Sequence, residues 1–148
     1  MKVGTVAFYS GDSMIDWLVR TATRSLVDHV SFCINDLEMI EALPGGVKIS
    51  PQRLPCYVID LVSVINLASL SSIIAPLKNL SYSWIDDLQA GIGIDHTLPS
   101  DHALNCSMLV SLILRKCGAR LPYATSPEIL LKELLSSYPA VGLFYLGG

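Results

Sequence analysis

The chain has 148 residues, which is enough for one domain whose core buries roughly two thirds of the surface that the unfolded chain exposes. Charged residues make up only 16% and the net charge is −3 without a basic cluster, so the electropositive stripe of a nucleic-acid-binding protein is missing. Apolar residues make up 51% and the mean hydropathy is +0.50, which raises the question of a membrane span.

The first third of the chain predicts a strand, a short helix and three antiparallel strands. Val3–Tyr9 is apolar and ends in a turn, and Met14–Thr21 has the apolar period of a helix. The segment from His29 to Ile34 alternates strictly, which predicts a strand whose odd-numbered residues share one face. Turn residues then separate it from a return strand, Met39–Ala42, and from a third strand over residues 47–50.

The most apolar stretch, from Val58 to Leu77, predicts one or two helices that continue to Leu80. It contains an aspartate, an asparagine, four serines and Pro76, so a core or partner-facing helix fits it better than a membrane span. Docking of a lipid chain or a partner over Val58–Ala75 stays open, as does peripheral membrane contact. We recognise no secretory signal in the first nine residues, and we expect a cytoplasmic protein with no transmembrane span.

The last third predicts two helices and a strand after a loop over residues 81–100. Asn105 is the N-cap of a periodic helix that begins at Cys106 and stops at Gly118. Ser126 caps a second helix that runs through Leu135, and the apolar tail from Val141 to Leu146 predicts a strand that joins the sheet. The economical interpretation is a single α+β domain over residues 1–148.

Cys106 is the best-placed of the four cysteines for chemistry. At a helix N-terminus, unpaired N–H groups and the helix dipole favour a thiolate, which is the nucleophilic form. Cys117 ends the same helix, where the dipole disfavours negative charge, and Cys33 and Cys56 lie in or beside strands. Taken alone, Cys106 is still more typical of a small core residue than of a nucleophile.

His29 is a candidate base for Cys106, on the expectation that the helix packs on the sheet face that carries His29. A base needs an acceptor that orients its second ring nitrogen, and Glu41 on the return strand is the nearest candidate. A two-residue turn sets Glu41 opposite Val30, on the wrong face, whereas a three-residue connection sets it opposite Ser31, beside His29. We predict the three-residue connection.

Several spaced motifs together resemble those of the NlpC/P60 superfamily in circularly permuted order, as in the YiiX/YebB-like and lecithin:retinol acyltransferase-like branch. The histidine strand precedes the cysteine helix here, whereas the common order is the reverse. The resemblance covers about Gly11 to Leu135. Its motifs are Gly11-Asp12, Asp28-His29-Val30-Ser31, Ile40-Glu41-Ala42, Gly46-Val47, Asn105-Cys106-Ser107 through Gly118, and Ser126-Pro127-Glu128.

The resemblance implies a papain-like fold, in which an antiparallel sheet packs against helices that include the nucleophile helix. It also implies that Cys106, His29 and Glu41 are the catalytic residues of a cysteine hydrolase (peptidase or amidase class) that forms an acyl-enzyme. The substrate would be a peptide, an isopeptide or an acyl lipid, and no cofactor is implied. An acyltransferase or thioesterase, and an inactive binding or inhibitory module on the same fold, are the alternatives.

Two further signals are weaker. His96, His102 and Cys106 are competent zinc ligands, but their spacing matches no standard site, so we expect no metal. Tyr82 and Trp84 are more typical of packing under a loop than of a substrate groove.

Overall fold

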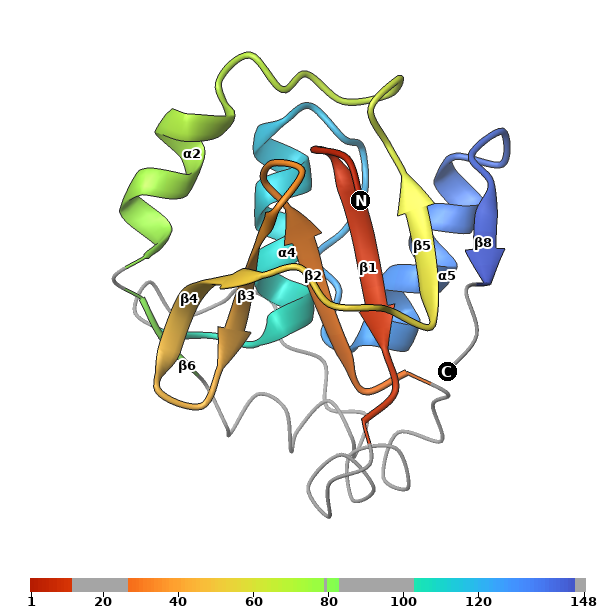
Figure 1. Cartoon of the computed structure of the whole chain (residues 1–148). Coiled ribbons are helices and arrows are strands. Elements are labelled where there is room, and N and C mark those ends of the chain that lie inside the picture. Colours follow the sequence, from red (N-terminus) through yellow and green to blue (C-terminus); the bar gives the residue numbers. More distant parts are fainter. Residues whose placement is uncertain (12–26, 79, 83–102, 146–148) are drawn as a thin grey trace.

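The computed structural model describes residues 1–11, 27–78, 80–82 and 103–145. The predicted helix Met14–Thr21 and most of the predicted loop over residues 81–100 lie outside them. The described residues form a mixed α+β structure in which an antiparallel sheet is covered by helices (Figure 1). Its elements are β1 (Thr5–Tyr9), β2 (His29–Cys33), β3 (Glu38–Leu43), β4 (Gly46–Pro51), β5 (Tyr57–Asp60), α2 (Leu70–Leu77), β6 (Ser81–Tyr82), β7 (Ala103–Leu104), α4 (Cys106–Lys116), α5 (Pro127–Ser137) and β8 (Leu143–Tyr145).

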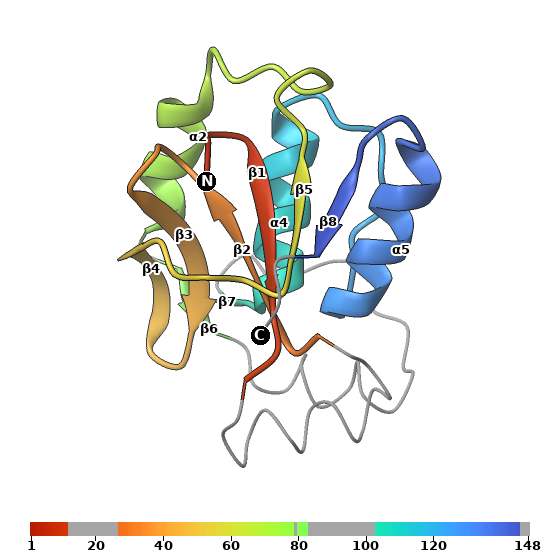
Figure 2. The same ribbon diagram turned by 45° about the vertical axis from the view of Figure 1, so that its right-hand side comes forward.

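The main sheet of the described chain has the strand order β4-β3-β2-β1-β5-β8, with every neighbouring pair antiparallel. The predicted meander of three strands is confirmed as β2, β3 and β4. The predicted C-terminal strand is also confirmed, because β8 pairs with β5 at one edge of the sheet. β1 lies near the middle of the sheet, between β2 and β5 (Figure 2).

The connection between β2 and β3 has the predicted three-residue length. Phe32 pairs with Ile40, and the N–H of Ile34 donates to the carbonyl of Glu38 at 3.0 Å. The side chain of Asn35 holds the turn by accepting two backbone N–H groups, each at 2.8 Å. Continuing the register places Glu41 opposite Ser31, so both lie on the face that carries His29.

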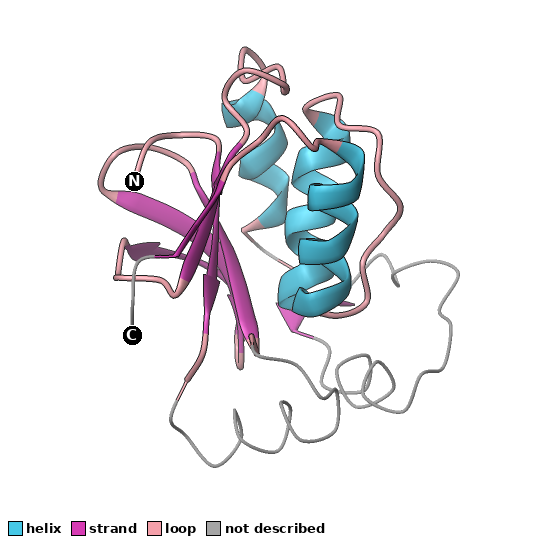
Figure 3. Ribbon diagram, turned by 90° about the vertical axis from the view of Figure 1, so that its right-hand side faces the viewer, coloured by secondary structure: helices cyan, strands magenta, loops and turns pink. Residues whose placement is uncertain are grey.

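The three described helices cover one face of the sheet (Figure 3). That face carries Val30, Phe32 and Ile40, which belong to one buried cluster with Leu109 of α4 and Leu130 of α5. Strand alternation makes this the wholly apolar face of β2, and it therefore packs against the helices. The expectation that the nucleophile helix packs on the face of His29 is wrong: α4 packs on the opposite face.

The second face of the sheet carries a smaller buried cluster of Ala7, Tyr9, Cys33, Met39 and Val58. The chain crosses this face between β4 and β5, in front of the sheet in Figure 1. This crossing segment, residues 52–56, lets the chain pass from one side of the β3-β2-β1 group to the other.

The apolar stretch from Val58 to Leu80 is less helical than its sequence predicts. Val58–Asp60 belongs to β5, a strand paired on both sides, where β-branched side chains pack well. Helix α2 occupies only Leu70–Leu77, and Pro76 lies inside it instead of interrupting it. No helix in the described part of the chain has the length and hydropathy that crossing a bilayer requires.

Both later helices begin as predicted. The side chain of Asn105 accepts the N–H of Met108 at 2.8 Å, and Ser126 accepts that of Ile129 at 3.3 Å. Gly118 follows α4 with φ of 93°, a left-handed conformation that favours glycine after a helix end. β6 and β7, at the borders of the predicted loop, pair in parallel.

Candidate active site

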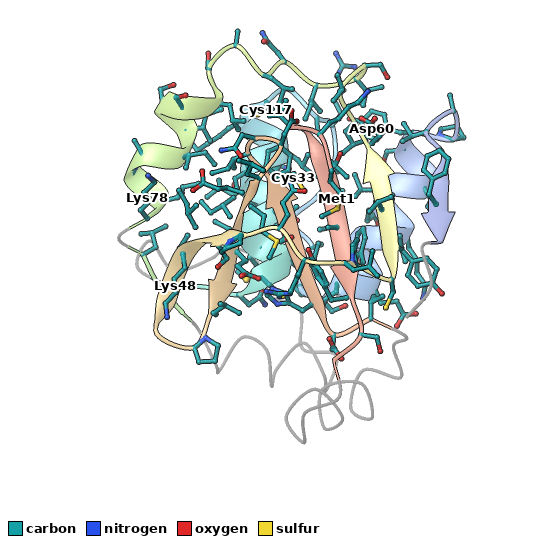
Figure 4. The ribbon with its side chains drawn as sticks, viewed as in Figure 1. Met1, Cys33, Lys48, Asp60, Lys78 and Cys117 are labelled. Atoms are coloured by element: carbon teal, nitrogen blue, oxygen red, sulfur yellow. The ribbon has the colours of Figure 1, made fainter. Side chains whose placement is uncertain are left out.

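Cys106 is the first residue of α4, and 3% of it is exposed. Cys33 lies within the sheet, and Cys117 lies at the opposite end of α4 (Figure 4). Burial raises the pKa of Cys33 to about 11 and also raises the pKa of Cys117. These two thiols are therefore protonated at neutral pH. Cys106 differs from them in having a histidine partner.

That partner is His29, the first residue of β2, whose side chain interacts with Cys106 and forms a hydrogen bond with Glu41. Its Nε2 lies 2.7 Å from Oε2 of Glu41. Nδ1 is therefore the ring nitrogen left for the thiol. Because His29 and Cys106 are the first residues of their elements, they meet where β2 and α4 both begin, at the lower end of the sheet in Figure 1. The structure thus brings together all three residues that the sequence singles out.

The environment keeps His29 and Glu41 charged. Burial alone lowers the pKa of His29, but hydrogen bonds with Cys106 and Glu41 and the charges of both outweigh it, and the pKa rises to about 9. Burial alone raises the pKa of Glu41, yet hydrogen bonds with His29, Ser50 and Arg53 lower it to about 2. At neutral pH the pair is an imidazolium bound to a carboxylate.

Arg53 is the residue of this cluster that sequence reasoning missed. Its Nη1 and Nη2 donate to Oε1 and Oε2 of Glu41 at 3.1 and 2.9 Å, a two-pronged contact that covers both carboxylate oxygens. The guanidinium also lies over the ring of Tyr9, with Cζ 4.5 Å from the ring centroid. The Glu41 side chain is completely buried, so it needs such a cation.

The sequence holds one hint of this contact. A carboxylate expected on an inner strand needs compensating charge, but nothing in the sequence selects Arg53 among ten lysines and arginines. Arg53 stands between Pro51 and Pro55, where no strand or helix period assigns its side chain a direction.

Of the three residues considered as metal ligands, the structure describes only Cys106. His96 and His102 fall outside the described residues. Within the described ranges, no group of three or more His, Cys, Asp and Glu side chains is arranged to hold a metal ion.

Two hollows formed by described residues lie away from Cys106 and His29. One is bordered by the β2–β3 turn and Pro51, and the other lies between that turn and α2, lined by Ile34, Ile49 and Ile74 among others. Neither includes Cys106 or His29.

Comparison with known proteins adds nothing to the geometry. No family model matches the chain, and a search of the curated proteins gives no match either.

Proposed function

We propose that the chain is a cysteine hydrolase of the papain-like type, built in the circularly permuted order of the NlpC/P60 superfamily. The observation that carries the proposal is that His29 interacts with both Cys106 and Glu41, with its Nε2 2.7 Å from the carboxylate. A nucleophile, a base and an orienting acceptor in this order are the elements of a catalytic triad. Such triads recur on unrelated folds and are recognised by their geometry.

In the proposed reaction, the proton of the Cys106 thiol has already passed to Nδ1 of His29, so the reaction starts from a thiolate beside an imidazolium. The sulfur then attacks the carbonyl carbon of an amide or ester, and the new C–S bond forms as the carbonyl π electrons move to oxygen. Collapse of this intermediate expels the amine or alcohol, which receives the proton from His29. Water then attacks the thioester and gives a proton to His29, which releases a carboxylic acid and restores the thiolate beside the imidazolium. If an amine or alcohol replaces the water, the same site acts as an acyltransferase.

The backbone N–H of Cys106 is the proposed oxyanion donor. It lies at the start of α4, and the side chain of Asn105 accepts the N–H of Met108, not that of Cys106. One such donor contributes about 3 kcal/mol to lowering the barrier. Glu41 acts by holding the tautomer and orientation of His29.

Acylation by p-nitrophenyl acetate tests the proposal. Intact-mass and peptide analysis of the wild-type chain at pH 7 should show one acetyl group on Cys106, followed by its slow loss to water. Cys106→Ser and His29→Gln should each lower the acylation rate at least about 100-fold. Cys33→Ala is the matched control, because it removes a thiol that burial keeps protonated, and it should react like wild type. Acetylation spread evenly over several cysteines, or unchanged in His29→Gln, would contradict the proposal.

A further inference from the structure

The contact between Arg53 and Glu41 has a feature that a simple ion pair lacks. Oε2 of Glu41 accepts from Nη2 of Arg53 at 2.9 Å and also faces Nε2 of His29 at 2.7 Å. Two cationic groups thus draw on one carboxylate oxygen. A stronger interaction of this oxygen with Arg53 therefore weakens its interaction with His29.

The position of Arg53 is determined by the crossing segment. Immediately before it, the N–H of Gln52 donates to the carbonyl of Leu37 at 2.8 Å, and the Gln52 side chain donates to the carbonyl of Asn35 at 2.7 Å. At the other end, the N–H of Cys56 donates to the carbonyl of Phe8 at 2.9 Å. The backbone on both sides of Arg53 is therefore attached to the sheet that carries Glu41 and His29.

The ring of Tyr9 packs against the guanidinium of Arg53 and is itself held in place. The Tyr9 hydroxyl makes contacts at 3.2 Å with Oγ of Ser31 and at 3.1 Å with the sulfur of Met39. Its ring also lies beside that of His29, with the centroids 5.9 Å apart. Tyr9, whose ring lies against Arg53, is the β1 residue that pairs with His29 of β2.

We propose that Arg53 is a positioning residue of the site: it holds the plane of the Glu41 carboxylate toward His29 and takes a share of its charge, so that the imidazolium releases its proton more readily. The catalytic role of Arg53 rests on the proposed function: a histidine that binds its proton too tightly cannot give it to a leaving group. The effect on His29 itself is independent of turnover.

The groups that interact with His29 in the described structure are neutral or anionic, and Arg53 reaches it through Glu41. Cys106 faces it from α4, Glu41 from β3 and Tyr9 from β1. Burial raises the pKa of Tyr9 to about 12, so its hydroxyl is neutral. Asp28, adjacent in the chain, directs its carboxylate to the N–H of Gly11 at 2.8 Å and 3.1 Å. Removing Arg53 therefore leaves His29 among neutral and anionic groups.

The test is an NMR titration of His29 in the full chain with ¹³C-labelled histidine. In Arg53→Gln, the proton-binding constant of His29 should rise about tenfold over wild type, since a positive charge near the imidazolium is lost. Arg53→Lys, which keeps the charge without the two-pronged contact, should give a smaller rise. Arg115→Gln is the matched control, because Arg115 also stacks on a tyrosine, Tyr123 at 4.5 Å, and it should leave His29 unchanged.

Folding of each variant is checked by circular dichroism, and Arg53→Lys serves as the test if Arg53→Gln does not fold. A proton affinity of His29 that stays the same or falls in the folded variants would overturn the inference. Such a result in an enzyme that still acetylates Cys106 leaves the proposed function intact. A rise without any acetylation of Cys106 would instead refute the hydrolase and support the positioning role.

Discussion

The two faces of the sheet differ in what holds them together. The face under α4 and α5 is apolar, with Val30, Phe32 and Ile40 packed against helix side chains. The face under the crossing segment is a mixed layer in which Glu41, Arg53 and Tyr9 compensate one another. A strand can therefore supply stability on one side and polar groups on the other, and the proposed catalytic pair lies at the strand end where the two sides meet.

The largest expected effect on stability lies on the helix-covered face. Phe32→Ala removes a fully buried ring and should lower the free energy of unfolding by about 3 to 5 kcal/mol. Cys33→Ala, one residue further along the same strand but on the other face, should cost only about 1 kcal/mol. Urea unfolding of the two variants measures the difference, and equal losses would show that both faces contribute alike.

Glu41→Gln should have the largest effect on reactivity from the second face. The carboxylate raises the pKa of His29 through its hydrogen bond and charge, so its loss lets burial lower the pKa again. The acetylation rate of Cys106 should fall about tenfold to hundredfold, because His29 without its acceptor loses part of its effect as a base.

Glu38→Gln is the matched control for this change, because Glu38 begins the same strand and is exposed. It should leave both the rate and the His29 titration at wild-type values. A rate in Glu41→Gln equal to that of Glu38→Gln would remove Glu41 from the site.

Stability should depend on pH through the His29–Glu41 pair. The folded-state pKa of His29 is raised from its usual 6.5 to about 9, so its contribution is complete below about 6.5 and is lost as the pH rises through 9. The folded-state pKa of Glu41 is lowered from 4.5 to about 2, so its contribution is present above 4.5 and is lost as the pH falls through 2.

Urea midpoints measured from pH 3 to pH 10 should therefore decline on both sides of the range between about 4.5 and 6.5. In His29→Gln the alkaline decline should be weaker. If the urea midpoint of His29→Gln fell as steeply at alkaline pH as that of wild type, other groups would cause the decline.

The smallest expected effect is at the helix cap that precedes Cys106. Asn105→Ala removes the side chain that accepts the N–H of Met108 and should cost about 1 kcal/mol. Asn105→Ser retains an acceptor and should recover most of that loss. Thermal unfolding of the two variants tests this, and equal losses would mean that the Asn105 contact with the carbonyl of Thr125 matters more than the cap.

Local patterns were sufficient for the elements whose signals are short-range. The caps at Asn105 and Ser126 and the alternation from His29 onward act over a few residues, and the structure has the predicted helices and strand there. The apolar stretch after Tyr57 was predicted poorly. Whether Val58 and Ile59 become strand or helix depends on pairing with β1 and β8, which are distant in sequence.

The sequence by itself determined that Cys106 begins a helix and that His29 begins a strand. It left two turn lengths open, and we predicted the one that sets Glu41 beside His29. The tertiary structure alone decided that α4 packs on the opposite face from His29 and that the two residues meet where their elements begin. It also decided that Arg53 completes the cluster. Local propensities act over a few residues, whereas the choice of face and the partner of a buried charge depend on burial across the whole sheet.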